Sequence, residues 1–198
     1  PRNIQCMNIW GGDGYARMAD DRELYVFGFG ELTGIPESDA MAYGGLNAQI
    51  PAHAIVLEEN QEFYLSLTNT SMVMRPDLFD PHTVHFHGFP NASTIMDGVP
   101  DSSVSINMGS TFTYFYNVVN PGTYIYHCHV EAAEHMQMGM MGNLYVKPAQ
   151  NKLPTYVDGT TTPDSPVGHT QGDQYVYNDG DGSTYYDVEF PLLITSMD

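Results

Sequence analysis

The distribution of proline and glycine is the feature that most restricts the fold of this chain. Thirteen prolines and 19 glycines are spread over 198 residues, and they break any apolar stripe of helical period. Between these breaks lie short runs rich in β-branched and aromatic residues, at 24–29, 54–56, 62–67, 83–89, 104–106, 111–118, 123–129 and 143–146. Many short strands separated by turn residues are typical of a sandwich or barrel, so the sequence predicts an all-β fold.

The composition changes after about residue 150. Residues 150–184 are rich in Pro, Gly, Asp and Thr and show no periodicity, which indicates a linker or an excursion over the surface. The segment 185–195 (YYDVEFPLLIT) again has the pattern of a strand. We therefore expect one domain over 1–149, a linker over 150–184, and an orphan strand in 185–198 that begins a second domain or folds back on the first.

The charge is strongly one-sided. Six Lys and Arg against 24 Asp and Glu give a net charge of −18. This argues against nucleic acid and against anionic membrane surfaces as partners, because both need a basic face. Hydrophobic residues make up 42% of the chain, which is enough for a core, and no apolar run is long enough to span a membrane.

Histidine is the residue type most informative about function. Six of the eight histidines form two groups, namely His82, His85 and His87, and then His127, His129 and His135. Isolated histidines are usually structural or solvated, and we interpret His53 and His169 in this way. The two cysteines, Cys6 and Cys128, are too few for a disulfide framework, and we interpret Cys6 as a free or incidental thiol, with a bond in an oligomer as the alternative.

Strand parity divides the clustered histidines between two sites. Successive side chains of a strand point to opposite faces, so His85 and His87 share one face and His82 lies on the other. In the same way His127 and His129 share a face, and Cys128 points away from them. With the two strands side by side, four imidazoles meet on one face, and His82 meets Cys128 inside the sandwich.

The two sites favour different metal chemistry. A loop over 130–140 can return His135 and Met140 to Cys128 and His82, and two imidazoles, a thiolate and a weak thioether are the ligands of a blue-copper centre. The four-imidazole face suits copper or zinc. The motif of this face contains no carboxylate, which disfavours magnesium, calcium and non-haem iron.

The motifs that contain these residues resemble those of the multicopper oxidases over residues 46–147. They are HTVHFHG at 82–88, DGVP at 97–100 and PGTYIYHCH at 121–129, followed by His135 and Met140. The resemblance implies a cupredoxin-like Greek-key β-sandwich with a C-terminal extension. It implies copper as the cofactor, with type 1 copper ligands His82, Cys128, His135 and Met140 and type 2/type 3 ligands His85, His87, His127 and His129. It also implies catalytic roles for Cys128, on the electron path, and for Asp97, which assists protons near the cluster.

The chain departs from the family pattern in two respects. Five residues separate His129 from His135, where family members typically have three, so Met136, Met138 and Met141 remain alternatives to Met140 as the axial ligand. The family also takes about half of its cluster imidazoles from a second cupredoxin domain, and this chain carries only one set. We therefore expect a second domain or subunit, in a homo-oligomer such as a trimer. Type 1 ligands in the first domain are similar to the arrangement in two-domain small laccases and copper nitrite reductases.

The resemblance implies a laccase-like oxidoreductase. Such an enzyme takes single electrons from a phenol, an amine or a metal ion and reduces dioxygen to water. Two alternatives remain open. An isolated cupredoxin would transfer electrons or bind copper through the type 1 residues alone. A copper nitrite reductase is the weaker alternative, because that family has an aspartate in place of His85 and no match to His129. The acidic composition favours a periplasmic or secreted location.

Overall fold

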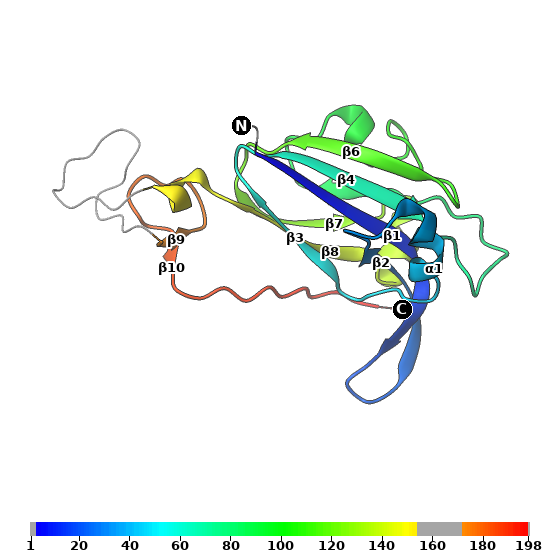
Figure 1. Ribbon diagram of the computed structural model, residues 1–198. Helices are drawn as coiled ribbons and strands as arrows, with labels where there is room; N and C mark the ends of the chain where they lie inside the picture. Colours follow the sequence, from blue (N-terminus) through cyan, green and yellow to red (C-terminus); the bar gives the residue numbers. More distant parts are fainter. Residues whose placement is uncertain (1–2, 154–171, 198) are drawn as a thin grey trace.

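Two four-stranded sheets pack face to face in the computed structural model, which describes residues 3–153 and 172–197 (Figure 1). The first sheet has the order β2-β1-β4-β6, with β1 Ile4–Arg17, β2 Glu23–Glu31, β4 Glu62–Asn69 and β6 Thr111–Asn117. The second has the order β3-β8-β7-β5, with β3 Ala52–Glu58, β5 His85–His87, β7 Gly122–His127 and β8 Met141–Lys147. The predicted all-β sandwich is therefore confirmed.

Both sheets mix parallel and antiparallel pairs. β1 lies parallel to β4 and β3 lies parallel to β8, while the remaining neighbours are antiparallel. β5 is only three residues long and forms an edge of the second sheet, where it pairs with the end of β7. The histidines of β5 therefore lie at the margin of the sandwich, beside His127.

Alternation along the strands builds the core between the sheets. Phe63, Leu65 and Leu67 of β4 are fully buried, as two-residue spacing requires for side chains on one face. Phe86 of β5 stacks on Tyr116 of β6 with ring centroids 4.3 Å apart. Because Phe86 points into this core, its neighbours in β5 are directed to the opposite face.

Several elements differ from the expected strands. Residues 104–106 form no strand, and only Ile106 bridges to His82. The strand expected over 123–129 ends at His127. The segment 130–140, expected as a loop, contains the helix α2, Ala132–Gln137. β1 was not expected, because Gly11, Gly12 and Gly14 interrupt it and resemble turn residues.

Short helices complete the first part of the chain. α1 spans Ala40–Gly44, and single 3₁₀ turns occur at Glu37–Asp39, Thr94–Met96 and Ala149–Lys152. Within the described residues, no helix is long and apolar enough to cross a membrane.

The C-terminal region is mostly irregular. β9, Gln174–Tyr175, pairs with β10, Tyr185–Tyr186, and residues 187–197 contain no further strand. The strand expected over 185–195 is thus reduced to two residues. Lys147 of β8 contacts Glu189 and Tyr186, which attaches this region to the second sheet. Residues 154–171 of the expected linker, with His169, lie outside the described residues.

Candidate metal centre

Cys128 lies at the centre of a buried group of three potential ligands. Its thiol follows directly after β7, with His135 Nδ1 at 3.2 Å and His82 Nδ1 at 4.0 Å from Sγ. All three side chains are fully buried, and their ligand atoms lie within 4.8 Å of one another. Both imidazoles therefore present the same nitrogen to the sulfur in a space that excludes water.

Burial sets the protonation of this group. Desolvation, followed by the nearby His135, lowers the pKa of His82 to about 3, so its imidazole is neutral and keeps a lone pair for a metal. Desolvation raises the pKa of the Cys128 thiol to about 11. The Nε2 atoms of His82 and His135 have no hydrogen-bond partner among the described residues. Two imidazoles that converge on a buried thiol are a donor set suited to a soft metal ion rather than to a packed core.

The helix α2 brings His135 to Cys128. It begins after Glu131, whose left-handed backbone (φ 44°) turns the chain back toward β7. The His135 N–H donates to the Glu131 carbonyl at 3.0 Å, and the Met140 N–H donates to the His135 carbonyl at 2.9 Å. The Cys128 N–H in turn donates to the Met140 carbonyl at 3.2 Å, so backbone hydrogen bonds close the segment on itself.

Met140 is the methionine that lies beside this group. It is fully buried, and a Cβ added to Gly11 would lie 3.2 Å from its Cε and 3.0 Å from His82 Cδ2. Met136 and Met138 are only partly buried. Met141 lies in β8, opposite His127 in the strand register. The position of Met140 favours it over the other three as a fourth ligand.

Four imidazoles gather on the opposite face of the same strands. The His85 ring centroid lies 5.2 Å from that of His127 and 5.1 Å from that of His129, and the His127 and His129 rings stack at 5.7 Å. His87 Nδ1 lies 3.2 Å from His127 Nε2. The ligand atoms of His85, His87 and His127 lie within 4.8 Å of one another. His129 borders this set, and its N–H donates to Thr83 Oγ1 at 3.0 Å.

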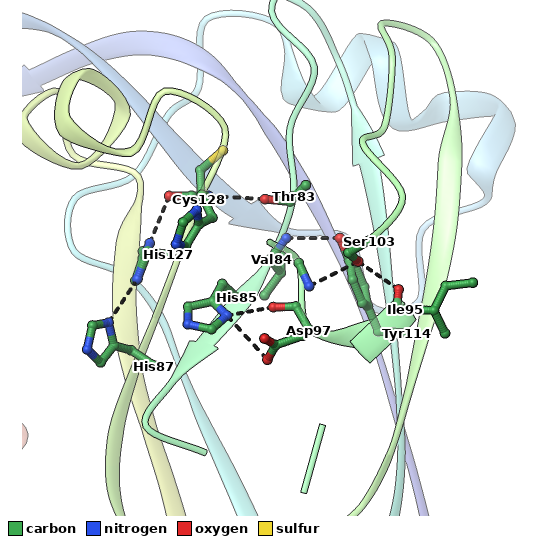
Figure 2. A network of polar contacts seen from close by, with 12 residues as sticks. Thr83, Val84, His85, His87, Ile95, Asp97, Ser103, Tyr114, His127 and Cys128 are labelled. Atoms are coloured by element: carbon green, nitrogen blue, oxygen red, sulfur yellow. Dashed lines mark hydrogen bonds and ion pairs between the residues drawn. The ribbon is translucent and has the colours of Figure 1, made fainter. Parts of the chain in front are cut away.

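Carbonyl groups fix the orientation of two of these rings (Figure 2). A carbonyl oxygen only accepts, so His85 donates from Nδ1 to the Asp97 carbonyl at 2.6 Å, and His127 donates from Nδ1 to the Cys128 carbonyl at 2.8 Å. Each ring then keeps the lone pair of Nε2 for a metal, as is common where a carbonyl group accepts from the other nitrogen of a metal-binding histidine. Burial lowers the pKa of His127 to about 4, so this ring is neutral.

Asp97 adds a carboxylate to this face. Its Oδ1 lies 3.4 Å from His85 Nδ1, and its side chain is half-buried. The adjacent Gly98 has a left-handed φ of 74°, and a Cβ there would lie 2.1 Å from the Val84 carbonyl oxygen. The close approach of this turn to β5 therefore places Asp97 against His85.

The remaining predicted residues lie apart. His53 is exposed and lies 3.4 Å from Glu31, and Cys6 is an exposed free thiol. Sequence reasoning missed Asp80, whose Oδ2 lies 3.5 Å from His135 Nε2. It also missed Tyr114, whose hydroxyl accepts from the Val84 N–H at 3.0 Å. The only sequence signal for Asp80 was its position two residues before His82. The sequence contained no comparable signal for Tyr114.

Comparison with known proteins identifies the family. A sequence profile described as "Multicopper oxidase" matches residues 33–151, which is more than half of the chain. The chain belongs to the multicopper oxidases. Members of this family use copper ions, in agreement with the cysteine and imidazole donors found here.

Relatives of this multicopper oxidase chain include enzymes and a solved structure. An L-ascorbate oxidase of Cucurbita pepo var. melopepo is 33% identical over 58% of this chain and 20% of its own length. Laccase abr2 of Aspergillus fumigatus is 33% identical over 61% of this chain and 19% of its own length. The blue copper oxidase of Nitrosomonas europaea is 30% identical with a TM-score of 0.58, over 80% of this chain and 42% of that structure. The chain spans about a fifth of the length of the curated relatives it matches, and the structural match confirms the cupredoxin-like fold.

Proposed function

We propose that this chain supplies the first cupredoxin domain of a laccase-like multicopper oxidase. In such an enzyme a reductant is oxidised by one electron at a type 1 copper, and dioxygen is reduced to water at a trinuclear cluster. The single observation that supports this most is the placement of Cys128 between His127 and His129. Cys128 faces His82 and His135, while its two neighbours face His85 and His87.

The buried group fits a type 1 copper. His82, Cys128, His135 and Met140 would hold the ion, which when bound supplies a one-electron redox couple. The chain excludes water from this position, since all four side chains are fully buried. Backbone hydrogen bonds within the closed segment hold His135 and Met140 against Cys128. This preorganisation limits rearrangement when an electron arrives or leaves.

The four-imidazole face fits a share of a type 2/type 3 cluster. His85, His87, His127 and His129 would hold copper there, and the complete cluster supplies the reduction of dioxygen. Asp97 orients His85 through its carbonyl group, and its half-buried carboxylate can hold a proton beside that ring. Four imidazoles are about half the number that the family uses, so we propose that a second cupredoxin domain or subunit completes the cluster.

The wider organisation follows from this proposal. Residues 1–149 form the cupredoxin domain, residues 150–184 form a linker or surface excursion, and residues 185–198 lead toward a second cupredoxin domain. The reductant is a phenol, an amine or a metal ion, and the assembly is a homo-oligomer such as a trimer. A periplasmic or secreted location suits the acidic surface of a copper protein.

An electron-transfer cupredoxin is the alternative, and it is supported by the self-contained geometry of the group around Cys128. Copper content and the visible spectrum separate the two functions. A laccase-like enzyme should contain several coppers per chain, show an intense blue band and consume dioxygen with a phenol. A single copper per chain in a blue protein that is inert toward dioxygen would favour the alternative.

Three variants test the roles assigned to the two groups of residues. Cys128→Ser should abolish the blue band, and survival of the band would refute the type 1 assignment. His85→Ala should keep the blue band and abolish dioxygen consumption, because His85 lies on the opposite face. His53→Ala is the matched control, since this exposed histidine lies outside both groups, and it should leave both readouts unchanged.

A further inference from the structure

A continuous series of aromatic rings connects the surface to His135. The ring centroids of Tyr15 and Tyr25 are 5.7 Å apart, those of Tyr25 and Phe27 are 5.7 Å apart, and those of Phe27 and His135 are 5.6 Å apart. Tyr15 and Tyr25 are register partners in β1 and β2, and two-residue spacing in β2 places Phe27 next to Tyr25 on the same face. The solvent-exposed fraction of the residue falls along this series, from 47% at Tyr15 to 1% at Phe27 and 0% at His135.

A cavity of about 530 Å³ opens against the second ring of this series. It lies between the end of the β1–β2 hairpin, the residues that follow α2 and the C-terminal segment, and its apolar lining includes Met18, Leu24, Tyr25, Met138 and Met197. The volume is in the range of small-molecule sites. Thioethers and a tyrosine ring pack well against a flat aromatic molecule. The ion pair of Arg22 with Asp20, 2.6 Å long and exposed, adds a polar group to the lining.

The cavity and the aromatic series are joined by a backbone hydrogen bond. The Phe27 N–H donates to the carbonyl of Met138 at 3.0 Å, so the wall of the cavity is fixed to the ring that contacts His135. His135 itself is fully buried, and its Nε2 faces Asp80 at 3.5 Å. An organic molecule cannot touch this imidazole in the structure, whereas it can touch Tyr25.

We propose that this cavity binds a planar aromatic reductant, a phenol or an aromatic amine, and that Tyr25 and Phe27 couple it electronically to His135. This inference rests on the proposed function. With a copper ion held by His135 and Cys128, the bound phenol would give up one electron to Cu(II), leaving Cu(I), and would release its hydroxyl proton to water. Tyr25 keeps its own proton, because its hydroxyl donates to the buried Asp13 carboxylate at 2.8 Å. Tyr25 and Phe27 are therefore positioning residues. Tyr25 contacts the reductant, both rings couple it to His135, and neither side chain is chemically changed.

Binding is tested first in the copper-free chain, where no oxidant is present. The probe is 2,6-dimethoxyphenol, titrated against the protein by NMR. Ala19→Trp places a large ring in the cavity from an exposed turn and should weaken binding about tenfold, which is about 1.4 kcal/mol. Val119→Trp is the control, because this exposed residue does not line the cavity, and it should bind as the parent does. Equal binding by both variants would overturn the proposed site.

Electron delivery is tested in the copper-loaded chain under argon, by the rate at which the blue band bleaches. Two reductants are compared: 2,6-dimethoxyphenol, and the hexaammineruthenium(II) cation, which needs no cavity. Ala19→Trp and Tyr25→Leu should slow bleaching by the phenol about tenfold and leave bleaching by ruthenium unchanged. Tyr25→Phe keeps the ring and should retain most of the phenol rate. A ruthenium rate that falls in parallel would indicate a disturbed copper site and would overturn the coupling role.

The two proposals fail in different ways. If the blue band forms and the phenol bleaches Ala19→Trp and Tyr25→Leu as fast as the parent, the cavity inference is wrong and the proposed function stands. If the parent chain never forms a blue band, the proposed function fails, while the copper-free titration still reports whether the cavity binds the phenol.

Discussion

His127 donates from Nδ1 to the carbonyl oxygen of Cys128, the residue that follows it, at 2.8 Å. This short bond fixes the His127 ring on the outer face of β7, with Nε2 directed toward His87, while the thiol of Cys128 points into the sandwich (Figure 2). One peptide unit therefore sets the geometry of both ligand groups. A disturbance can still be confined to one group, because the two groups contact different neighbours.

Gly11→Ala should disturb the group around Cys128 alone. The new Cβ would lie 3.0 Å from His82 Cδ2 and 3.2 Å from Met140 Cε, so both side chains must shift. We expect a shifted or weakened blue band and a loss of stability of about 1–3 kcal/mol from overpacking. Visible spectroscopy and denaturant unfolding measure the two effects. Gly45→Ala is the control, since its nearest neighbours are at 3.5 and 3.9 Å, and an altered blue band there would contradict the steric explanation.

Gly98→Ala should disturb the four-imidazole face. The added Cβ would meet the Val84 carbonyl oxygen at 2.1 Å, and relief of this clash moves Asp97 away from His85. We expect less copper at the four-imidazole face and slower dioxygen consumption, with the blue band retained. Gly109→Ala has the same left-handed strain (φ 73° against 74°) but nothing within 4 Å of its Cβ. It should therefore cost only about 1 kcal/mol of stability, and equal copper loss in both variants would exclude the clash as the cause.

Tyr114→Phe should destabilise the protein more than Tyr116→Phe does. The Tyr114 hydroxyl accepts from the buried Val84 N–H at 3.0 Å, and its removal leaves that donor unsatisfied at a cost of about 1–3 kcal/mol. The Tyr116 hydroxyl is also buried, but it has no hydrogen-bond partner within the described part of the chain. Its removal should be neutral or stabilising. Urea unfolding of the two variants measures the difference, and a reversed order would refute this account.

The turn around Asp179 should loosen at low pH. Burial alone would raise the pKa of Asp179, but hydrogen bonds from Thr184, Gln150 and Gly182 outweigh it and hold the pKa well below its usual range. The ionised form therefore stabilises the turn above the unfolded pKa of about 3.9, and this contribution is lost as the pH falls through the lower, folded value. The Thr184 amide resonance, followed by NMR from pH 6 down to about pH 1, should move at the acidic end only. The same amide in Asp179→Ala should already be displaced at neutral pH, and an undisplaced signal would contradict the role of the carboxylate.

The fold class and the grouping of the histidines could be predicted from the sequence, because both follow from two-residue periodicity. The same reasoning missed β1, where glycines serve close packing rather than a turn. A Cβ at Gly12 would lie 2.6 Å from Thr70 Oγ1, and one at Gly14 would lie 2.5 Å from the Ala48 nitrogen. Such contacts come from residues distant in sequence, and local pattern does not contain them.

The helix α2 was missed for a different reason. It is only six residues long, so it is too short to show a helical period in its apolar positions. The ring series through Tyr25 and Phe27 could likewise not be predicted from the sequence. Its contact with His135 depends on where that helix returns the chain, and the helix itself was expected to be a loop.

The hydrogen bonds that close the segment from Cys128 to Met140 also bear on protein engineering. Three of the four proposed type 1 ligands lie in this short segment, whose ends are joined through the Cys128 N–H and the Met140 carbonyl. The segment is therefore a candidate for transplantation between scaffolds as one piece. A recipient sandwich would have to provide a histidine in the place of His82, a glycine in the place of Gly11, and an aromatic residue in the place of Phe27, whose N–H donates to the Met138 carbonyl and whose ring packs on His135. Exchange of such cassettes between related sandwiches would be a direct way to tune redox potential without rebuilding the core.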